Sequence, residues 1–135
     1  MRFKKVDGND LDILFELLTQ RIHSISHYET PKRNEHDRFV KAHPYRHWAI
    51  IFEDEIPIGT FYLQNDNSVG FNIVAPTLAL VSEVLAYIRA KFEPLAEVKS
   101  KVPPYFYINV SYENEELGEF LLNCGAVPIQ LSYKI

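Results

Sequence analysis

Apolar residues recur along this chain with two different periods, and the change from one period to the other marks the expected elements. Apolar residues at steps of three and four predict a long helix over residues 11–25 and another over residues 77–92, each with one apolar side. Alternating or continuous apolar runs of strand length lie before, between and after these helices. The expected strands cover residues 2–6, 45–52, 56–63, 68–74, 105–110 and 129–135, and two shorter helices cover residues 35–41 and follow Asn114.

The order of these elements, β-α-α-β-β-β-α-β-α-β, predicts one mixed sheet with helices on its faces, and hence the α/β class. The unit from residue 69 to residue 110 joins two strands through a helix, so these strands should lie parallel with a right-handed connection. Asn114 is suited to cap the last helix, and Gly125 to end it in the left-handed conformation. We find no linker or repeat, so residues 1–135 are expected to form a single domain.

Composition and charge exclude several classes of protein. Hydrophobic residues make up 47% of the 135 residues and charged residues 24%, a balance typical of a folded globule. The net charge of -4 argues against nucleic acid as a partner, because proteins that bind it usually carry a basic excess. No apolar run is long enough to cross a membrane, and the first residues lack the form of a secretory signal. The single cysteine, Cys124, cannot form an internal disulfide. We therefore expect a cytoplasmic protein with no membrane partner.

Three local patterns occur in a particular order. Ile58-Gly59 lies on the third expected strand, and Gly70-Phe71-Asn72-Ile73 places a glycine before an aromatic residue on the fourth. Asn114 and Gly125 stand eleven positions apart around the last short helix. With these patterns and this element order, the chain resembles the GCN5-related N-acetyltransferase (GNAT) superfamily over nearly its whole length.

The resemblance implies a GNAT-like fold in which the fourth and fifth strands splay apart and acetyl-CoA lies in the gap. It also implies direct transfer of the acetyl group to an amine, with a backbone N–H stabilising the oxyanion and with no metal. The oxyanion donor would be the N–H of Ile73 or Val74, and the start of the helix at Thr77 would bind the pyrophosphate. The residues that the resemblance assigns to acetyl-CoA are Phe71, Ile73, Val74, Thr77, Leu78, Ala79, Leu80, Asn109 and Asn114.

One part of the family pattern is missing at the expected pyrophosphate site. The family's Q/R-x-x-G-x-G/A loop is replaced by the sequence APTLALVSE, which holds no glycine, arginine or lysine. Two interpretations follow. Either other basic groups, such as Arg46, Lys91 or Lys101, help to hold CoA, or the pocket no longer takes CoA.

The usual proton donor and base are missing as well. Many relatives have a tyrosine four positions before the late glycine, where this chain has Leu121. Tyr112 is then the candidate acid for the leaving thiolate, and its alternative role is that of an edge aromatic packed on the last helix. Asn72 stands where relatives often place a glutamate base, and its amide could orient a water or the acceptor amine.

Four residues are candidate contacts to the acceptor. His27 and Tyr28 lie in the connection after the first helix, and Tyr62 and Gln64 lie at the end of the third strand. The alternative for each is an exposed loop or sheet-face role. No metal site is expected, because only His23 and His27 have helical ligand spacing and no third ligand is evident.

The sequence therefore predicts an acetyl-CoA-dependent N-acetyltransferase that acts on a primary amine of a small molecule. One alternative is a non-catalytic domain of the same fold that binds a ligand or partner and has lost CoA binding. Another is an enzyme that takes its acyl group from a carrier protein. That alternative predicts a basic surface patch beside the gap between the fourth and fifth strands. The apolar alternation of residues 131–135 also leaves pairing with a second copy, as a homodimer, open.

Overall fold

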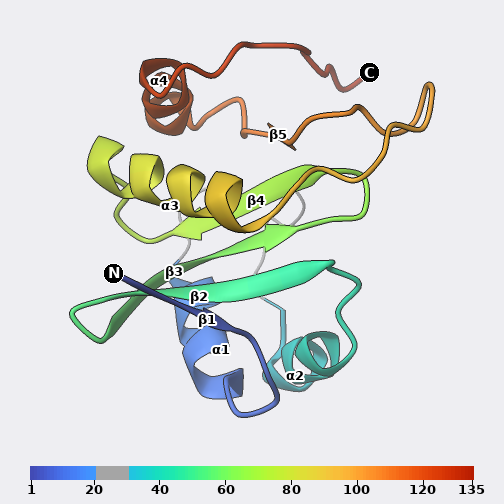
Figure 1. Cartoon of the computed structure of the whole chain (residues 1–135). Coiled ribbons are helices and arrows are strands. Elements are labelled where there is room, and N and C mark those ends of the chain that lie inside the picture. The colour runs from blue at the N-terminus through green and yellow to red at the C-terminus, as the bar shows by residue number, and fades with distance from the viewer. Residues whose placement is uncertain (21–30) are drawn as a thin grey trace.

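The computed structural model describes residues 1–20 and 31–135 and is built around a five-stranded sheet in the order β1-β2-β3-β4-β5 (Figure 1). The strands are β1 (Arg2–Lys5), β2 (His47–Glu53), β3 (Ile56–Leu63), β4 (Ser68–Ile73) and β5 (Tyr107–Ile108). The helices are α1 (Leu11–Thr19), α2 (Arg33–Lys41), α3 (Leu78–Lys91) and α4 (Glu115–Asn123). This is the mixed α/β architecture that the order of apolar patterns predicts.

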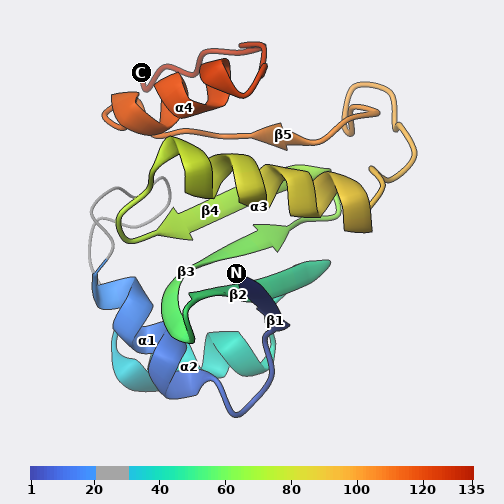
Figure 2. The same cartoon turned by 60° about the vertical axis from the view of Figure 1, so that its left-hand side comes forward.

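Neighbouring strands from β1 to β4 run antiparallel, whereas β5 lies parallel to β4. The parallel pair is connected through α3, as the crossover unit between residues 69 and 110 predicts. Helices α1 and α2 cover one face of the sheet and α3 covers the other, with α4 beside α3 at the β5 end (Figures 1 and 2). None of the helices in the described part of the chain is long and apolar enough to cross a membrane.

The core has apolar layers on both faces of the sheet. Side chains of α1 and α2 pack against one set of β2 residues, namely Trp48, Ile50 and Phe52. The residues between them, Ala49 and Ile51, face the other way and belong to the layer that contains Val84 and Ile88 of α3. Burial on both faces explains why β2 shows a continuous apolar run instead of an alternation.

Local hydrogen bonds fix where the helices begin and end. The side chains of Thr77 and Asn114 cap α3 and α4, accepting hydrogen bonds from the N–H groups three residues further along, at 3.2 Å in both cases. Gly125 follows α4 with φ 89°, which is the left-handed conformation expected of it.

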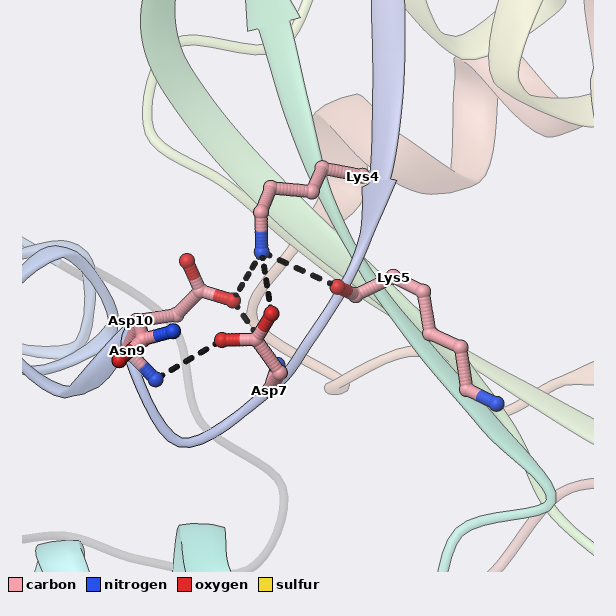
Figure 3. A network of polar contacts seen from close by, with 5 residues as sticks. All are labelled: Lys4, Lys5, Asp7, Asn9 and Asp10. Atoms are coloured by element: carbon pink, nitrogen blue, oxygen red, sulfur yellow. Dashed lines mark hydrogen bonds and ion pairs between the residues drawn. The ribbon is translucent and has the colours of Figure 1, made fainter.

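A compact polar network joins β1 to the start of α1 (Figure 3). The carboxylate of Asp10 is almost fully buried and accepts hydrogen bonds from Lys4 Nζ at 2.6 Å and from the N–H of Asp7 at 2.8 Å. Asp7 in turn accepts from the N–H of Asn9 at 2.8 Å. Because the buried carboxylate is paired and hydrogen-bonded, its burial costs little free energy of folding. The network thereby ties β1 to the start of α1.

The structure corrects the sequence-based expectation at the end of the chain and shortens the fifth strand. Residues 129–135 form no strand, although their apolar residues alternate, and their side chains are exposed. The fifth strand is reduced to two residues of the six expected. Both differences have one cause, since a strand exists only where a neighbour supplies hydrogen bonds. The described part of the first expected helix ends at Thr19, and residues 21–30 lie outside the described residues.

Candidate functional site

Strands β4 and β5 pair at one end only. The parallel ladder consists of Ser68 opposite Tyr107 and Val69 opposite Ile108, while β4 continues to Ile73. A cavity of about 140 Å³ opens beyond the last pair. Its lining comes from β3, β4, β5 and the start of α4, and consists of Tyr62, Gln64, Ser68, Val69, Gly70, Phe71, Ile108, Asn109, Val110, Ser111, Asn114 and Leu117. None of these lining residues is charged, so this cavity, called the slot below, suits a neutral chain with amide or hydroxyl groups.

The hydrogen bonds of β4 with β3 determine which backbone groups face the slot. The N–H of Gln64 donates to the carbonyl oxygen of Ser68 at 2.9 Å, and the N–H of Val74 donates to that of Ile58 at 3.0 Å. Backbone direction alternates along a strand, so residues 69, 71 and 73 direct their N–H and C=O groups away from β3 and toward the β5 side. The expectation for Val74 as an oxyanion donor is therefore wrong, because its N–H is bonded to β3.

A buried asparagine holds the closed end of the slot together. Asn67, in the turn between β3 and β4, is fully buried, and its amide nitrogen donates to the carbonyl oxygens of Leu95 and Pro103 at 2.9 and 2.8 Å. Its amide oxygen accepts from the N–H of Leu95 at 2.7 Å. Its own carbonyl accepts from the N–H of Tyr107 at 3.2 Å. One residue thus fixes the connection from α3 to β5 against the start of β4.

Asp66 adds a second tie at the same end. Its carboxylate accepts hydrogen bonds from the N–H of Ser68 at 2.9 Å, from the Ser68 hydroxyl at 2.6 Å and from the Tyr107 hydroxyl at 3.1 Å. Partial burial raises the pKa of Asp66, but these hydrogen bonds outweigh burial and hold its pKa below the ordinary value. Burial, and then the bond to Asp66, raises the pKa of Tyr107. The bonded pair is therefore carboxylate and neutral phenol at neutral pH.

Tyr62 lies over β4 because residue 70 has no side chain. Gly70 is directly opposite Tyr62 in the ladder between β3 and β4, and a Cβ at that position would collide with the Tyr62 ring. The other face of the ring stacks on Tyr45 with 4.1 Å between centroids. The glycine of the Gly-aromatic pattern thus places a tyrosine at the wall of the cavity.

Comparisons with solved structures agree with this arrangement. A chimeric spermidine N-acetyltransferase SpeG from Vibrio cholerae and hSSAT superimposes with a TM-score of 0.61 at 15% identity, over 96% of this chain and 84% of that one. A possible acetyltransferase from Clostridium difficile 630 gives 0.59 at 12% identity, over 99% and 97%. This chain has the GNAT fold. An aminoglycoside acetyltransferase from an uncultured soil metagenomic sample, in complex with sisomicin, gives 0.56 at 8% identity, over 99% and 95%. No protein-family model and no curated protein matches the sequence.

Within this GNAT fold, only some of the predicted site residues lie at the cavity. Five of them line the cavity: Tyr62, Gln64, Phe71, Asn109 and Asn114. Asn72 is half-buried opposite the buried Thr60, and strand alternation directs its side chain to the face opposite Phe71, the face that Tyr62 shares. His27 and Tyr28 lie outside the described residues. The slot residues that sequence reasoning missed include Ser68, Val110 and Ser111, which carry no pattern beyond their place on or beside these strands.

The start of α3, where the GNAT resemblance places the pyrophosphate, offers fewer donors than expected. The N–H of Leu80 is taken by the Thr77 hydroxyl, which leaves those of Leu78 and Ala79 at an exposed helix end. The suggested help from Lys91 is wrong, because it ends α3 about 20 Å from Leu78 along the helix axis. The suggested help from Arg46 is wrong for the same reason, because its guanidinium donates to the carbonyl oxygen of Glu93, which lies beyond that end of α3.

The expected acid is also not at the slot. Tyr112 is 98% exposed and is not among the lining residues, so its assignment as the proton donor to a thiolate is wrong. The apolar packing on α4 that was its alternative is likewise not seen at this exposure. Cys124 is half-buried and belongs to the apolar layer between α3 and α4. The described residues contain no group of three or more metal-ligating side chains.

Proposed function

We propose that this chain, as one domain over residues 1–135, is an N-acetyltransferase that moves an acetyl group from acetyl-CoA to a primary amine of a small molecule. The observation that carries the proposal is the opening between β4 and β5, where the ladder stops at Val69 and Ile108 and a neutral cavity begins. The fold neighbours include a spermidine N-acetyltransferase and an aminoglycoside acetyltransferase, which supports acetyl transfer to an amine.

The slot fits the pantetheine part of acetyl-CoA. That part is a chain of amides. The backbone groups of Phe71, which lines the cavity, and of Ile73 further along β4 point away from β3, and no strand of the described chain lies beside them. Asn109, Ser111 and Asn114 add neutral polar groups on the opposite wall. The pyrophosphate part fits less well, because the start of α3 has two free N–H groups and no basic residue in the stretch from Ala75 to Glu83. CoA affinity should therefore be modest.

Acetyl-CoA would supply the activated acetyl thioester, and the residues around the slot would act on the incoming amine. The N–H of Ile73, which points away from β3 two residues beyond the cavity-lining Phe71, would stabilise the negative charge that develops on the carbonyl oxygen. Asn72 and Tyr62 occupy the opposite face of β3 and β4 and would orient the amine or a water. The described lining holds no carboxylate or imidazole, so the amine would lose its proton to water, directly or through an ordered chain.

Thermal unfolding with and without acetyl-CoA tests binding, and thiol release in the presence of amines tests turnover. At one hundred times the dissociation constant, acetyl-CoA should add about 2.7 kcal/mol to the free energy of unfolding. Asn109→Trp fills the slot and should abolish this shift, whereas Asn123→Trp, on the exposed side of α4, should keep it. No shift at millimolar acetyl-CoA for the wild-type chain would refute the proposal.

The second candidate is a non-catalytic ligand-binding domain of the same fold. The observations that favour it are the glycine-free start of α3 and the exposed Tyr112. It predicts stabilisation by a ligand without any thiol release, or no effect of CoA at all. The carrier-protein variant predicts a basic surface patch beside the cavity; the lining of the cavity itself holds no arginine or lysine, so the variant stays a prediction.

A further inference from the structure

Tyr62 forms one wall of the slot, and its neighbours on the sheet decide where its ring lies. In the ladders on either side of β3, Tyr62 is opposite Trp48 of β2 and opposite Gly70 of β4. The β2 side is filled by Trp48, which is buried, whereas the β4 side is open because Gly70 has no side chain. The ring therefore leans over Gly70, where a Cβ would collide with it, and reaches the slot.

Tyr45 holds the ring of Tyr62 in that position. The two rings stack with 4.1 Å between centroids and 8° between planes. Tyr45 is itself enclosed, because its ring meets Trp48 and Phe39 edge to face at 5.3 and 5.7 Å. Its N–H donates to Nδ1 of His43 at 3.2 Å. A ring packed among such neighbours has little freedom to change its rotamer, so the wall that Tyr62 forms is a fixed boundary of the slot.

The other sides of the closed end of the slot are apolar. The ladder between β4 and β5 ends with Val69 opposite Ile108, and both side chains belong to the apolar layer packed against α3. Phe71 lies in the same layer and lines the cavity from that face. Strand alternation puts Phe71 on the face of the sheet opposite the Tyr62 ring. An aromatic ring therefore stands on each face of the slot where the two strands come together, in a cavity of about 140 Å³.

We infer that Tyr62 sets the size of the acyl group that this chain accepts. The inference rests on the proposed function, which anchors the phosphate end of acyl-CoA at the start of α3. Helix α3 follows the far end of β4, and the slot closes where Val69 meets Ile108, so the acyl group is the part that reaches the Tyr62 ring. An acetyl group fits beside this ring, whereas a longer acyl chain has to displace it.

The limit is sharp because moving the ring is costly. Displacing Tyr62 breaks its stack on Tyr45 and forces a new rotamer among packed neighbours. An acyl chain that finds space instead gains roughly fourfold in affinity for each methylene group that it buries. The wild-type chain should therefore bind hexanoyl-CoA more weakly than CoA itself, and a variant without the ring should show the reverse order.

Calorimetric titration of the full chain with CoA, acetyl-CoA and hexanoyl-CoA, in the absence of any amine, tests the inference. The measured quantity is the ratio of the dissociation constant of hexanoyl-CoA to that of CoA. Tyr62→Ala removes a ring that is larger than the carbon chain by which a hexanoyl group exceeds an acetyl group. This change should lower the ratio roughly 10-fold or more. Tyr62→Phe keeps the ring and should keep the wild-type ratio.

Tyr87→Ala is the matched control. The ring of Tyr87 also packs on the sheet, stacked on Phe3 with 3.9 Å between centroids, but Tyr87 is not among the lining residues. Its loss should cost stability, as the loss of Tyr62 does, and leave the ratio unchanged. Urea unfolding establishes that each variant is folded under the conditions of the titration. Tyr62→Leu keeps an apolar side chain in the core, should also lower the ratio, and replaces Tyr62→Ala if the alanine variant does not fold.

Three results would overturn the inference: a wild type that binds hexanoyl-CoA as tightly as CoA, a ratio that neither Tyr62→Ala nor Tyr62→Leu lowers, or a ratio that Tyr87→Ala lowers as much. The proposed function fails in a different way. If CoA and acetyl-CoA bind but no amine is acetylated, acetyl transfer is refuted and the ratio still decides the role of Tyr62. If neither CoA nor any acyl-CoA binds, both are refuted.

Discussion

Replacing Asn67 by glycine should loosen the closed end of the slot. The amide of Asn67 makes three hydrogen bonds to backbone groups of Leu95 and Pro103, and the side chain is fully buried. Glycine accepts the φ of 69° at this position, so the substitution removes the amide without straining the backbone. The change therefore isolates the contribution of the three side-chain bonds.

The expected loss follows from the number of bonds. Each hydrogen bond contributes about 1 kcal/mol net, and leaving partly buried partners unpaired adds to the cost. Together they predict a loss of about 3–4 kcal/mol in the free energy of unfolding, a large part of the ~5–15 kcal/mol that a domain has. The corresponding fall in melting temperature is about 10 °C.

Urea unfolding is the assay, and Asn65→Gly is the control. Asn65 lies in the same turn, two residues before Asn67, and is exposed, so its replacement should cost less than about 1 kcal/mol. If Asn67→Gly proves no more destabilising than Asn65→Gly, the reasoning about the buried amide is refuted. Faster hydrogen exchange at the N–H of Tyr107, which bonds to the carbonyl of Asn67, would show that β5 itself has loosened.

Two further predictions concern stability. Gly59→Ala should destabilise the protein by about 1–3 kcal/mol in urea, because the new Cβ would lie 2.8 Å from Ile73 Cα and collide with the carbonyl of Asn72. Gly118→Ala, where the Cβ meets open space in the middle of α4, should instead stabilise it by about 0.5–1 kcal/mol; equal effects of the two changes would contradict the packing argument. The depressed pKa of Asp66 means that its contribution is present above its ordinary value of 3.8 and is lost as the pH falls through the folded pKa. The difference in unfolding free energy between the wild type and Asp66→Asn should therefore shrink as the pH falls below about 4, and a constant difference would rule out this assignment.

Much of the site could be predicted from the sequence where local patterns carry the information. The Gly70-Phe71 pair and the crossover unit located the slot, and the cap at Asn114 followed from residue type alone. These features depend on neighbours a few residues away, which a pattern in the sequence records directly. Five of the predicted site residues line the cavity for this reason.

Other features depended on contacts between distant segments. The sequence places Asn67 only between two expected strands, and nothing in it shows that the amide of Asn67 reaches Leu95 and Pro103. In the same way, Val74 is excluded as an oxyanion donor by a hydrogen bond to Ile58 in another strand. Such bonds join residues that are brought together only by the folded sheet.

The sequence by itself determined the order of the elements, the parallel crossover, and the cap at Asn114 with the stop at Gly125, because periodicity and residue type act over a few positions. The tertiary structure alone decided where β5 stops pairing, which backbone groups face the slot, and that Tyr112 and residues 127–135 are exposed. Alternation makes residues 129–135 able to form a strand, but a strand needs a partner edge, and whether one is available is a property of the assembled molecule.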